Sequence, residues 1–185
     1  IGTYDGLTRY DGYENKIYKN TLEHKILLSN RIRTIAEDSK GILWLGTDEG
    51  ISLYNYYKER FDTIYSNSNL KKDSHGPIVR KIFPLEKNHI ILCATEGEGL
   101  LVFNEEYQLI KQYVPDEQLS SESVSFHDGL TLDDDNYVFS TSVGLVHFNL
   151  SEGTFRCPLP HEIFNGKSIV RIGPNEILVT RTRGI

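Results

Sequence analysis

One stretch decides the fold: Thr47-Asp48-Glu49-Gly50-Ile51-Ser52-Leu53-Tyr54-Asn55. Its general form is Thr, two or three residues, Gly, Leu or Ile, two residues, Tyr or Phe, and Asp or Asn. Three more complete copies begin at Thr3, Thr95 and Thr141, and a fifth, from Thr180, is cut off at Ile185. The glycines of successive copies lie 40 to 49 residues apart, a period typical of β-propeller blades.

Each part of the repeat has a structural role. A short apolar run precedes each glycine, which fits a strand buried on both faces. The glycine supplies a positive φ in a tight hairpin turn, and the Asp or Asn begins the next turn through its side-chain hydrogen bonds. The apolar runs are residues 42–45, 90–93, 137–139 and 177–179.

A further strand lies upstream of each apolar run and another downstream of each hairpin, which gives four short antiparallel strands per repeat. We label them A to D from the inside of the ring outwards. The sequence therefore predicts an all-β chain of about four blade-equivalents, with almost no helix, from a larger, seven-bladed type of propeller. The expected parts of this partial propeller, residues 1–185, are half blade 1–20, blades at about 30–65, 76–113 and 123–156, and half blade 167–185.

Composition narrows the function. The 185 residues carry a net charge of −6, which gives no basic footprint for nucleic acid. No apolar run has the length of a membrane span, so we expect this part of the protein to lie outside the bilayer. Cys93 and Cys157 have no metal-ligand spacing, and a disulfide between them is disfavoured because Cys93 lies within an apolar strand. We expect no cofactor and no metal.

Residues 28–51 resemble the two-component regulator propeller repeat. The matching features are Ser29-Asn30 before strand A, Glu37-Asp38 at the following turn, and Gly41-Ile42-Leu43-Trp44-Leu45-Gly46-Thr47 running into the hairpin. The resemblance implies a periplasmic propeller from a hybrid sensor histidine kinase of the inner membrane, of a kind taken to sense oligosaccharides. It supplies no fixed motif of ligand-binding residues.

Three local groups invite a chemical interpretation, and each has a simpler one. Asp133-Asp134-Asp135-Asn136 falls where the repeat has its A–B turn and lacks the spacing of a calcium loop. His127-Asp128 has no accompanying nucleophile motif. Trp44 can stack on a sugar, but its place in an apolar strand predicts a core residue. No catalytic residue is assigned.

The ligand is expected on the face formed by the D–A connections and the B–C hairpins, because loops there vary without disturbing the stacked sheets. A rim of hydrogen-bonding groups at this face would suit a sugar or an anionic sugar acid. The candidate ligand-binding residues are Arg31, Lys72, His75, Arg80, Asp48, Glu49, Glu96 and Glu98.

The leading interpretation is a non-catalytic, extracytoplasmic sensor region that responds to an oligo- or polysaccharide, with self-association or a dimer expected in the parent receptor. The first alternative is a carbohydrate-active enzyme on a propeller, either a lyase or a glycoside hydrolase. The second is a protein-interaction scaffold. The fold does not separate these functions, because propellers support all of them.

Overall fold

The computed structural model describes residues 1–66, 76–159 and 164–181. Within these residues it contains seventeen β-strands, one short 3-10 helix and no α-helix, so the all-β prediction is confirmed. The chain divides into two compact units. The first comprises Ile1–Cys93 and Val102–Ile110, and the second comprises Ala94–Leu101 and Lys111–Ile185.

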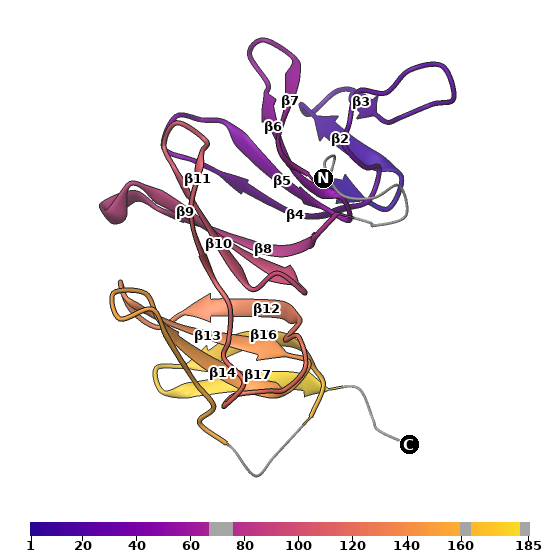
Figure 1. Cartoon of the computed structure of the whole chain (residues 1–185). Helices are drawn as coiled ribbons and strands as arrows, with labels where there is room; N and C mark the ends of the chain where they lie inside the picture. Colours follow the sequence, from indigo (N-terminus) through magenta and orange to yellow (C-terminus); the bar gives the residue numbers. More distant parts are fainter. Residues whose placement is uncertain (67–75, 160–163, 182–185) are drawn as a thin grey trace. The chain divides into compact units, whose positions relative to one another are not determined.

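The first unit opens with two sheets that follow the chain order (Figure 1). One is three-stranded, with β1 Gly2–Thr3, β2 Gly6–Tyr10 and β3 Asn15–Tyr18. The other is four-stranded, with β4 Ile32–Glu37, β5 Leu43–Thr47, β6 Gly50–Asn55 and β7 Arg60–Ser66. Each strand pairs antiparallel with the next, which is the meander that four strands per repeat requires.

A third sheet contributes residues to both units. It has the order β8-β9-β10-β11, and its first strand contacts β4. The bounds are β8 Ile78–Leu85, the 3-10 helix η1 Glu86–Asn88, β9 Ile90–Glu96, β10 Leu100–Asn104 and β11 Leu109–Tyr113.

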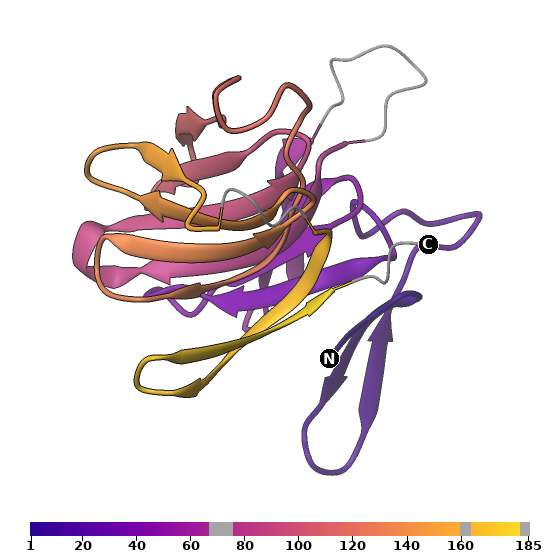
Figure 2. The same ribbon diagram turned by 90° about the horizontal axis from the view of Figure 1, so that it is seen from below.

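The second unit adds one four-stranded sheet and one hairpin (Figure 1, Figure 2). The hairpin, yellow in both views, lies against the sheet because its first strand contacts β12. The sheet contains β12 Phe126–Thr131, β13 Asn136–Thr141, β14 Gly144–Asn149 and β15 Thr154–Arg156. The hairpin contains β16 Gly166–Gly173 and β17 Glu176–Arg181.

The core of the first unit lies between stacked sheets. Leu7 and Tyr18 from the first sheet pack with Leu45 and Tyr54 from the second, and all four are buried. Trp44 has no exposed surface, and its ring centroid lies 5.6 Å from that of Phe103. The expectation that Trp44 is a core residue is therefore confirmed.

The second unit packs in the same way, with one difference from expectation. Val138 and Leu145 from the sheet are buried against Ile169 of the hairpin. We expected residues 177–179 to be buried on both faces, but the side chain of Leu178 is 54% exposed. The reason is that, among the described residues, only one face of β16–β17 has a sheet packed against it.

The hairpin glycines adopt the backbone conformation that the repeat predicts. Gly50 has a φ of 125°, which an L side chain rarely adopts. A Cβ atom there would lie only 2.0 Å from the carbonyl oxygen of Tyr65, so conformation and close packing both require glycine. The equivalent glycines also have positive φ, namely Gly6 at 114°, Gly99 at 76° and Gly144 at 115°.

The threonine of the repeat closes each hairpin, a role that sequence reasoning did not assign. The Oγ1 of Thr47 donates to the carbonyl oxygen of Gly50 (3.0 Å) and accepts from the backbone N–H of Glu49 (3.0 Å). The same donor and acceptor pair recurs at the other copies, Thr3, Thr95 and Thr141. One hydroxyl thus satisfies two backbone groups at each turn, and it belongs to a buried residue at Thr47, Thr95 and Thr141 but to an exposed one at Thr3.

Replacing Thr47 with valine is expected to lower the free energy of unfolding by about 1–3 kcal/mol, because the buried carbonyl oxygen of Gly50 loses its hydroxyl donor. Thr47→Ser keeps the hydroxyl and serves as the control. Urea unfolding of both variants, followed by circular dichroism, measures the difference. Equal midpoints for the valine and serine variants would show that the hydroxyl does not stabilise the turn.

Candidate functional site

The first unit carries an open depression of about 640 Å³ at its hairpin ends. Its walls come from the β1–β2 and β5–β6 hairpins and from the connection between β3 and β4. Three of the predicted site residues, Arg31, Asp48 and Glu49, line it together. The sequence therefore identified part of a real concave surface.

The polar centre of the depression is Asp48, whose side chain is 17% exposed. Both oxygens of this carboxylate accept from the guanidinium of Arg33, through Nε and through Nη2 (2.9 Å). Nη1 of Arg31 also donates to Oδ2 (3.3 Å). Two guanidinium groups thus share one carboxylate, and the paired fork of Arg33 fixes its orientation.

Tyr4 supplies an aromatic ring beside these two arginines. Its hydroxyl accepts from Nη1 of Arg33 (3.1 Å), and its ring centroid lies 5.0 Å from the Arg33 guanidinium and 5.8 Å from that of Arg31. The residue is 71% exposed. The Tyr4 ring is exposed to solvent and is flanked by hydrogen-bond donors. It therefore offers an aromatic face on which a polar ligand can stack.

The electrostatics keep this cluster ionised. The hydrogen bond from Arg33 is the main reason that the pKa of Asp48 lies below its ordinary value, and Arg31 lowers it further, against the opposing effect of burial. The hydrogen bond to Asp48 correspondingly raises the pKa of Arg33. The ion pair between Asp48 and Arg33 therefore stays charged at physiological pH.

The connection that forms one wall is held by its own side chains. Oδ1 of Asn20 accepts the backbone N–H groups of Ile26 (2.8 Å) and Leu27 (2.9 Å). Oδ1 of Asn30 accepts the N–H of Asn20 (2.7 Å). The backbone carbonyl oxygen of Asn30 accepts the N–H of Gly6 (2.8 Å). These bonds fix the loop before any ligand arrives, which limits the entropy lost on binding.

Arg33 reaches Asp48 because it lies in a β-bulge. In three sheets the pairing of the first strand with the second skips the residue that follows its first pair, namely Arg33, His127 and Lys167 (β16 also skips Ile172 near its end). A bulge re-aims the side chain at the extra position. All three residues are basic types, a regularity that aligning the repeats on the skipped position would have revealed.

Of the other predicted residues, Arg80, Glu96 and Glu98 do not line this depression. Arg80 is half-buried on β8, the strand beside β4. Glu96 and Glu98 belong to the second unit, where Oε1 of Glu96 lies 3.9 Å from Nε2 of His127. Lys72 and His75 lie outside the described residues. The predicted rim is thus present in part, around Asp48.

The second unit has its own depression of about 550 Å³, lined by Asp116, Val143 and Cys157 among others. Cys157 and Cys93 are both free cysteines. Elsewhere in this unit, the hydroxyl of Ser168 donates to Asp128 (2.9 Å), and Nδ1 of His127 lies 2.5 Å from the carbonyl oxygen of Gly166. His127-Asp128 therefore joins β12 to β16.

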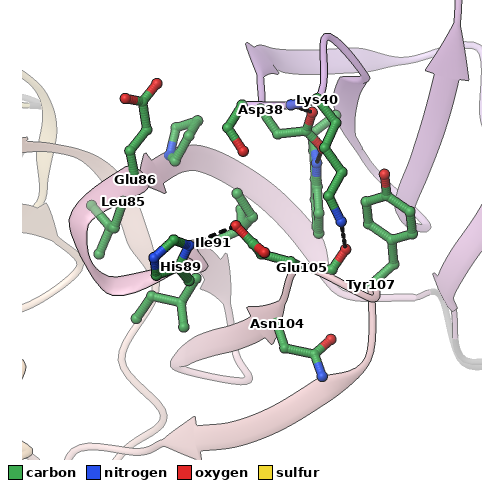
Figure 3. A pocket seen from close by; sticks show the side chains of 13 residues that line it. Asp38, Lys40, Leu85, Glu86, His89, Ile91, Asn104, Glu105 and Tyr107 are labelled. Carbon is green, nitrogen blue, oxygen red and sulfur yellow. Dashed lines mark hydrogen bonds and ion pairs between the residues drawn. The ribbon is translucent and has the colours of Figure 1, made fainter.

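Figure 3 shows a smaller cavity in the first unit, among the turns at the other ends of the strands. Nζ of Lys40 donates to the carbonyl oxygen of Glu105 (2.6 Å), and Nδ1 of His89 lies 2.8 Å from Oε1 of the same residue. The hydrogen bond from His89 is the main cause of the lowered pKa of Glu105. At about 20 Å³ the cavity has room for about one water molecule, which excludes a sugar.

Residues 133–136 form a turn held by their own side chains. Oδ1 of Asp133 accepts the backbone N–H groups of Asp135 (3.0 Å) and Asn136 (2.9 Å), and these bonds lower the pKa of Asp133.

Across residues 1–66, 76–159 and 164–181, no group of three or more His, Cys, Asp or Glu residues is arranged to hold a metal ion. The part of the chain that the structure describes has no helix with the length and hydropathy to span a membrane.

Comparison with solved structures identifies the fold. The extracellular domain of the putative hybrid two component system BT3049 from B. thetaiotaomicron matches with a TM-score of 0.71 and 19% identity over 98% of this chain. The extracellular domain of BT4673 from the same organism, a putative one component system, matches with a TM-score of 0.71 and 17% identity over 97% of this chain. The present chain spans 24% of the length of each.

A more distant match is the β-propeller domain of Cps50 (Swd1) from Myceliophteria thermophila, with a TM-score of 0.53 and 16% identity over 75% of this chain and 46% of that one. Comparison with curated protein sequences gave no significant match. The family model for the two component regulator propeller matches residues 26–49, which confirms the resemblance deduced from residues 28–51. The chain therefore has β-propeller architecture, and residues 26–49 carry a two component regulator propeller repeat.

Proposed function

We propose that this chain is part of a non-catalytic, periplasmic sensor region of a hybrid two-component regulator, and that it binds an oligo- or polysaccharide. The repeat at residues 26–49 and the likeness to extracellular domains of such systems support the sensor role. The observation that carries ligand binding is the cluster of Tyr4, Arg31, Arg33 and Asp48 around the depression.

This cluster suits a saccharide for physical reasons. Sugars present an apolar face of C–H groups and a rim of hydroxyls, so they bind where an exposed aromatic ring lies beside fixed hydrogen-bond donors and acceptors. Tyr4 provides the ring, and Arg31 and Asp48 provide charged partners. The volume of about 640 Å³ falls within the range of small-ligand sites.

The test uses the intact receptor, purified and screened against neutral and acidic oligosaccharides of defined structure, with a transcriptional reporter measured in parallel. Tyr4→Ala combined with Arg31→Ala is expected to lower affinity and reporter output at least about tenfold, because stacking and a charged partner are both lost. Tyr13→Ala combined with Arg60→Ala is the matched control, since Tyr13 and the Arg60 side chain are also exposed, at 95% and 67%.

If the Tyr4 and Arg31 variant binds and signals like the control, this depression is not the ligand site. Incubation with the same oligosaccharides should release no reducing ends and no unsaturated sugars. Turnover by the pure protein, abolished by one carboxylate substitution, would replace the sensor proposal with the enzyme alternative.

A further inference from the structure

The two arginines at the depression differ in solvent exposure and in how many of their N–H groups form hydrogen bonds. Arg33 has a side chain only 15% exposed, and its fork is occupied by Asp48 and by the hydroxyl of Tyr4. Arg31 has a side chain 59% exposed. Among the described residues it makes one side-chain hydrogen bond, the 3.3 Å contact to Asp48.

A guanidinium carries five N–H donors, so most of those on Arg31 face the depression or the solvent. The carboxylate that Arg31 contacts is Asp48, which is already held by Arg33 at both oxygens. The cluster therefore contains two full positive charges and one negative charge. An exposed guanidinium with free N–H donors can bind a carboxylate or a sulfate, because its planar geometry allows two parallel hydrogen bonds.

The wider wall keeps the same sign. Lys25 and Glu49, both exposed, also line the depression, and they cancel each other in charge. The lining residues alone are balanced in charge, and Arg33, which lies behind Asp48, adds one positive charge to them, on a chain whose net charge is −6. A positive depression on an acidic protein concentrates anionic ligands in preference to neutral ones.

We propose that the saccharide bound in this depression is anionic, and that Arg31 binds its carboxylate or sulfate group while Arg33 and Asp48 hold Arg31 in position. This proposal rests on the proposed function, since it names the chemical class of ligand for the same site. Arg31 is the residue that contacts the ligand. Arg33 and Asp48 are positioning residues.

The experiment measures binding to the intact receptor by calorimetry with three pairs of probes. Tetragalacturonate is paired with its full methyl ester, and a chondroitin 4-sulfate tetrasaccharide with its desulfated form, so that carboxylate and sulfate are separated. Maltotetraose and xylotetraose are the neutral probes. We expect at least one anionic probe to bind at least about tenfold more tightly than its matched, less charged form.

Arg31→Ala is expected to abolish that tenfold preference without lowering affinity for the less charged form, while Arg31→Lys keeps the charge and restores part of the preference. Asp48→Asn should reduce the preference and weaken its dependence on Arg31. Arg60→Ala, at a similarly exposed arginine, should change nothing. Because Arg31 is exposed, the thermal midpoint of its variants should equal that of the parent.

The outcomes separate the two proposals. If neutral probes bind as tightly as anionic ones and Tyr4→Ala weakens them, the sensor function stands and the anionic preference is wrong. If no probe of either kind binds, both proposals fail at this site. If an anionic probe binds but Arg31→Ala leaves its preference intact, the assignment of Arg31 is overturned.

Discussion

Replacing Trp44 with alanine is expected to lower the free energy of unfolding by about 3–5 kcal/mol. The side chain has no exposed surface, and its ring lies edge-on to Phe103 and Tyr107, at centroid distances of 5.6 and 5.8 Å. Truncation would remove these contacts and leave a cavity that the surrounding strands only partly fill. Urea unfolding followed by far-ultraviolet circular dichroism measures the change.

Trp44→Phe is the control, because it keeps an aromatic ring but loses the indole N–H. That N–H donates to Oδ2 of Asp38 (2.9 Å), so the phenylalanine variant should lose about 1.5–3 kcal/mol, the contribution of one hydrogen bond to a charged group. A change below about 1 kcal/mol for Trp44→Ala would show that the core does not depend on this side chain.

Replacing Gly50 with alanine is expected to be at least as damaging, with a loss of more than about 3 kcal/mol. The new Cβ would meet the carbonyl oxygen of Tyr65 at 2.0 Å and its carbonyl carbon at 3.0 Å. Both atoms are backbone, so β7 would have to move away from β6. The φ of 125° adds conformational strain of its own.

The chain offers a matched control for the conformational part of this effect. Gly12 has a φ of 101°, and a Cβ atom built there meets nothing within 4 Å. Gly12→Ala should therefore show the backbone strain alone, about 1–2 kcal/mol. Equal losses for the two variants would contradict the steric explanation at Gly50. The measurement is the urea midpoint of each purified protein.

The sequence predicted the fold well because the repeat encodes local structure. Each glycine and terminal Asn acts within its own hairpin, and each aromatic residue marks a strand that packs against the next sheet. For example, Oδ1 of Asn104 accepts the N–H of Gln108 at 2.8 Å, as a turn-forming Asx side chain does. The role of Thr47 was missed because a threonine within an apolar strand is explained by β-propensity alone. Its hydroxyl bonds appear only when the turn geometry is known.

The candidate site was predicted less completely, for two physical reasons. Arg31, Asp48 and Glu49 were selected because their loop position and charge are visible in the sequence, and the structure places all three around one depression. Arg33 was missed because strict alternation along a strand fails at a bulge, and the extra residue points where the pattern does not place it. Glu96 was grouped with Asp48 by its hairpin position, but it belongs to the other compact unit.

The extra residue at Arg33 has a consequence for how such a chain can diversify. It separates Ile32, which is buried, from the rest of β4, and the pairing with β5 resumes at Thr34. Substitution at the skipped position leaves the pairing on both sides unchanged. Deletion of that position would shift Ile32 by one residue relative to β5 and turn its buried side chain to the other face of the sheet. A point mutation at this position can therefore change the side chain presented beside Asp48 without changing the strand pairing, whereas an insertion or deletion there changes the pairing itself.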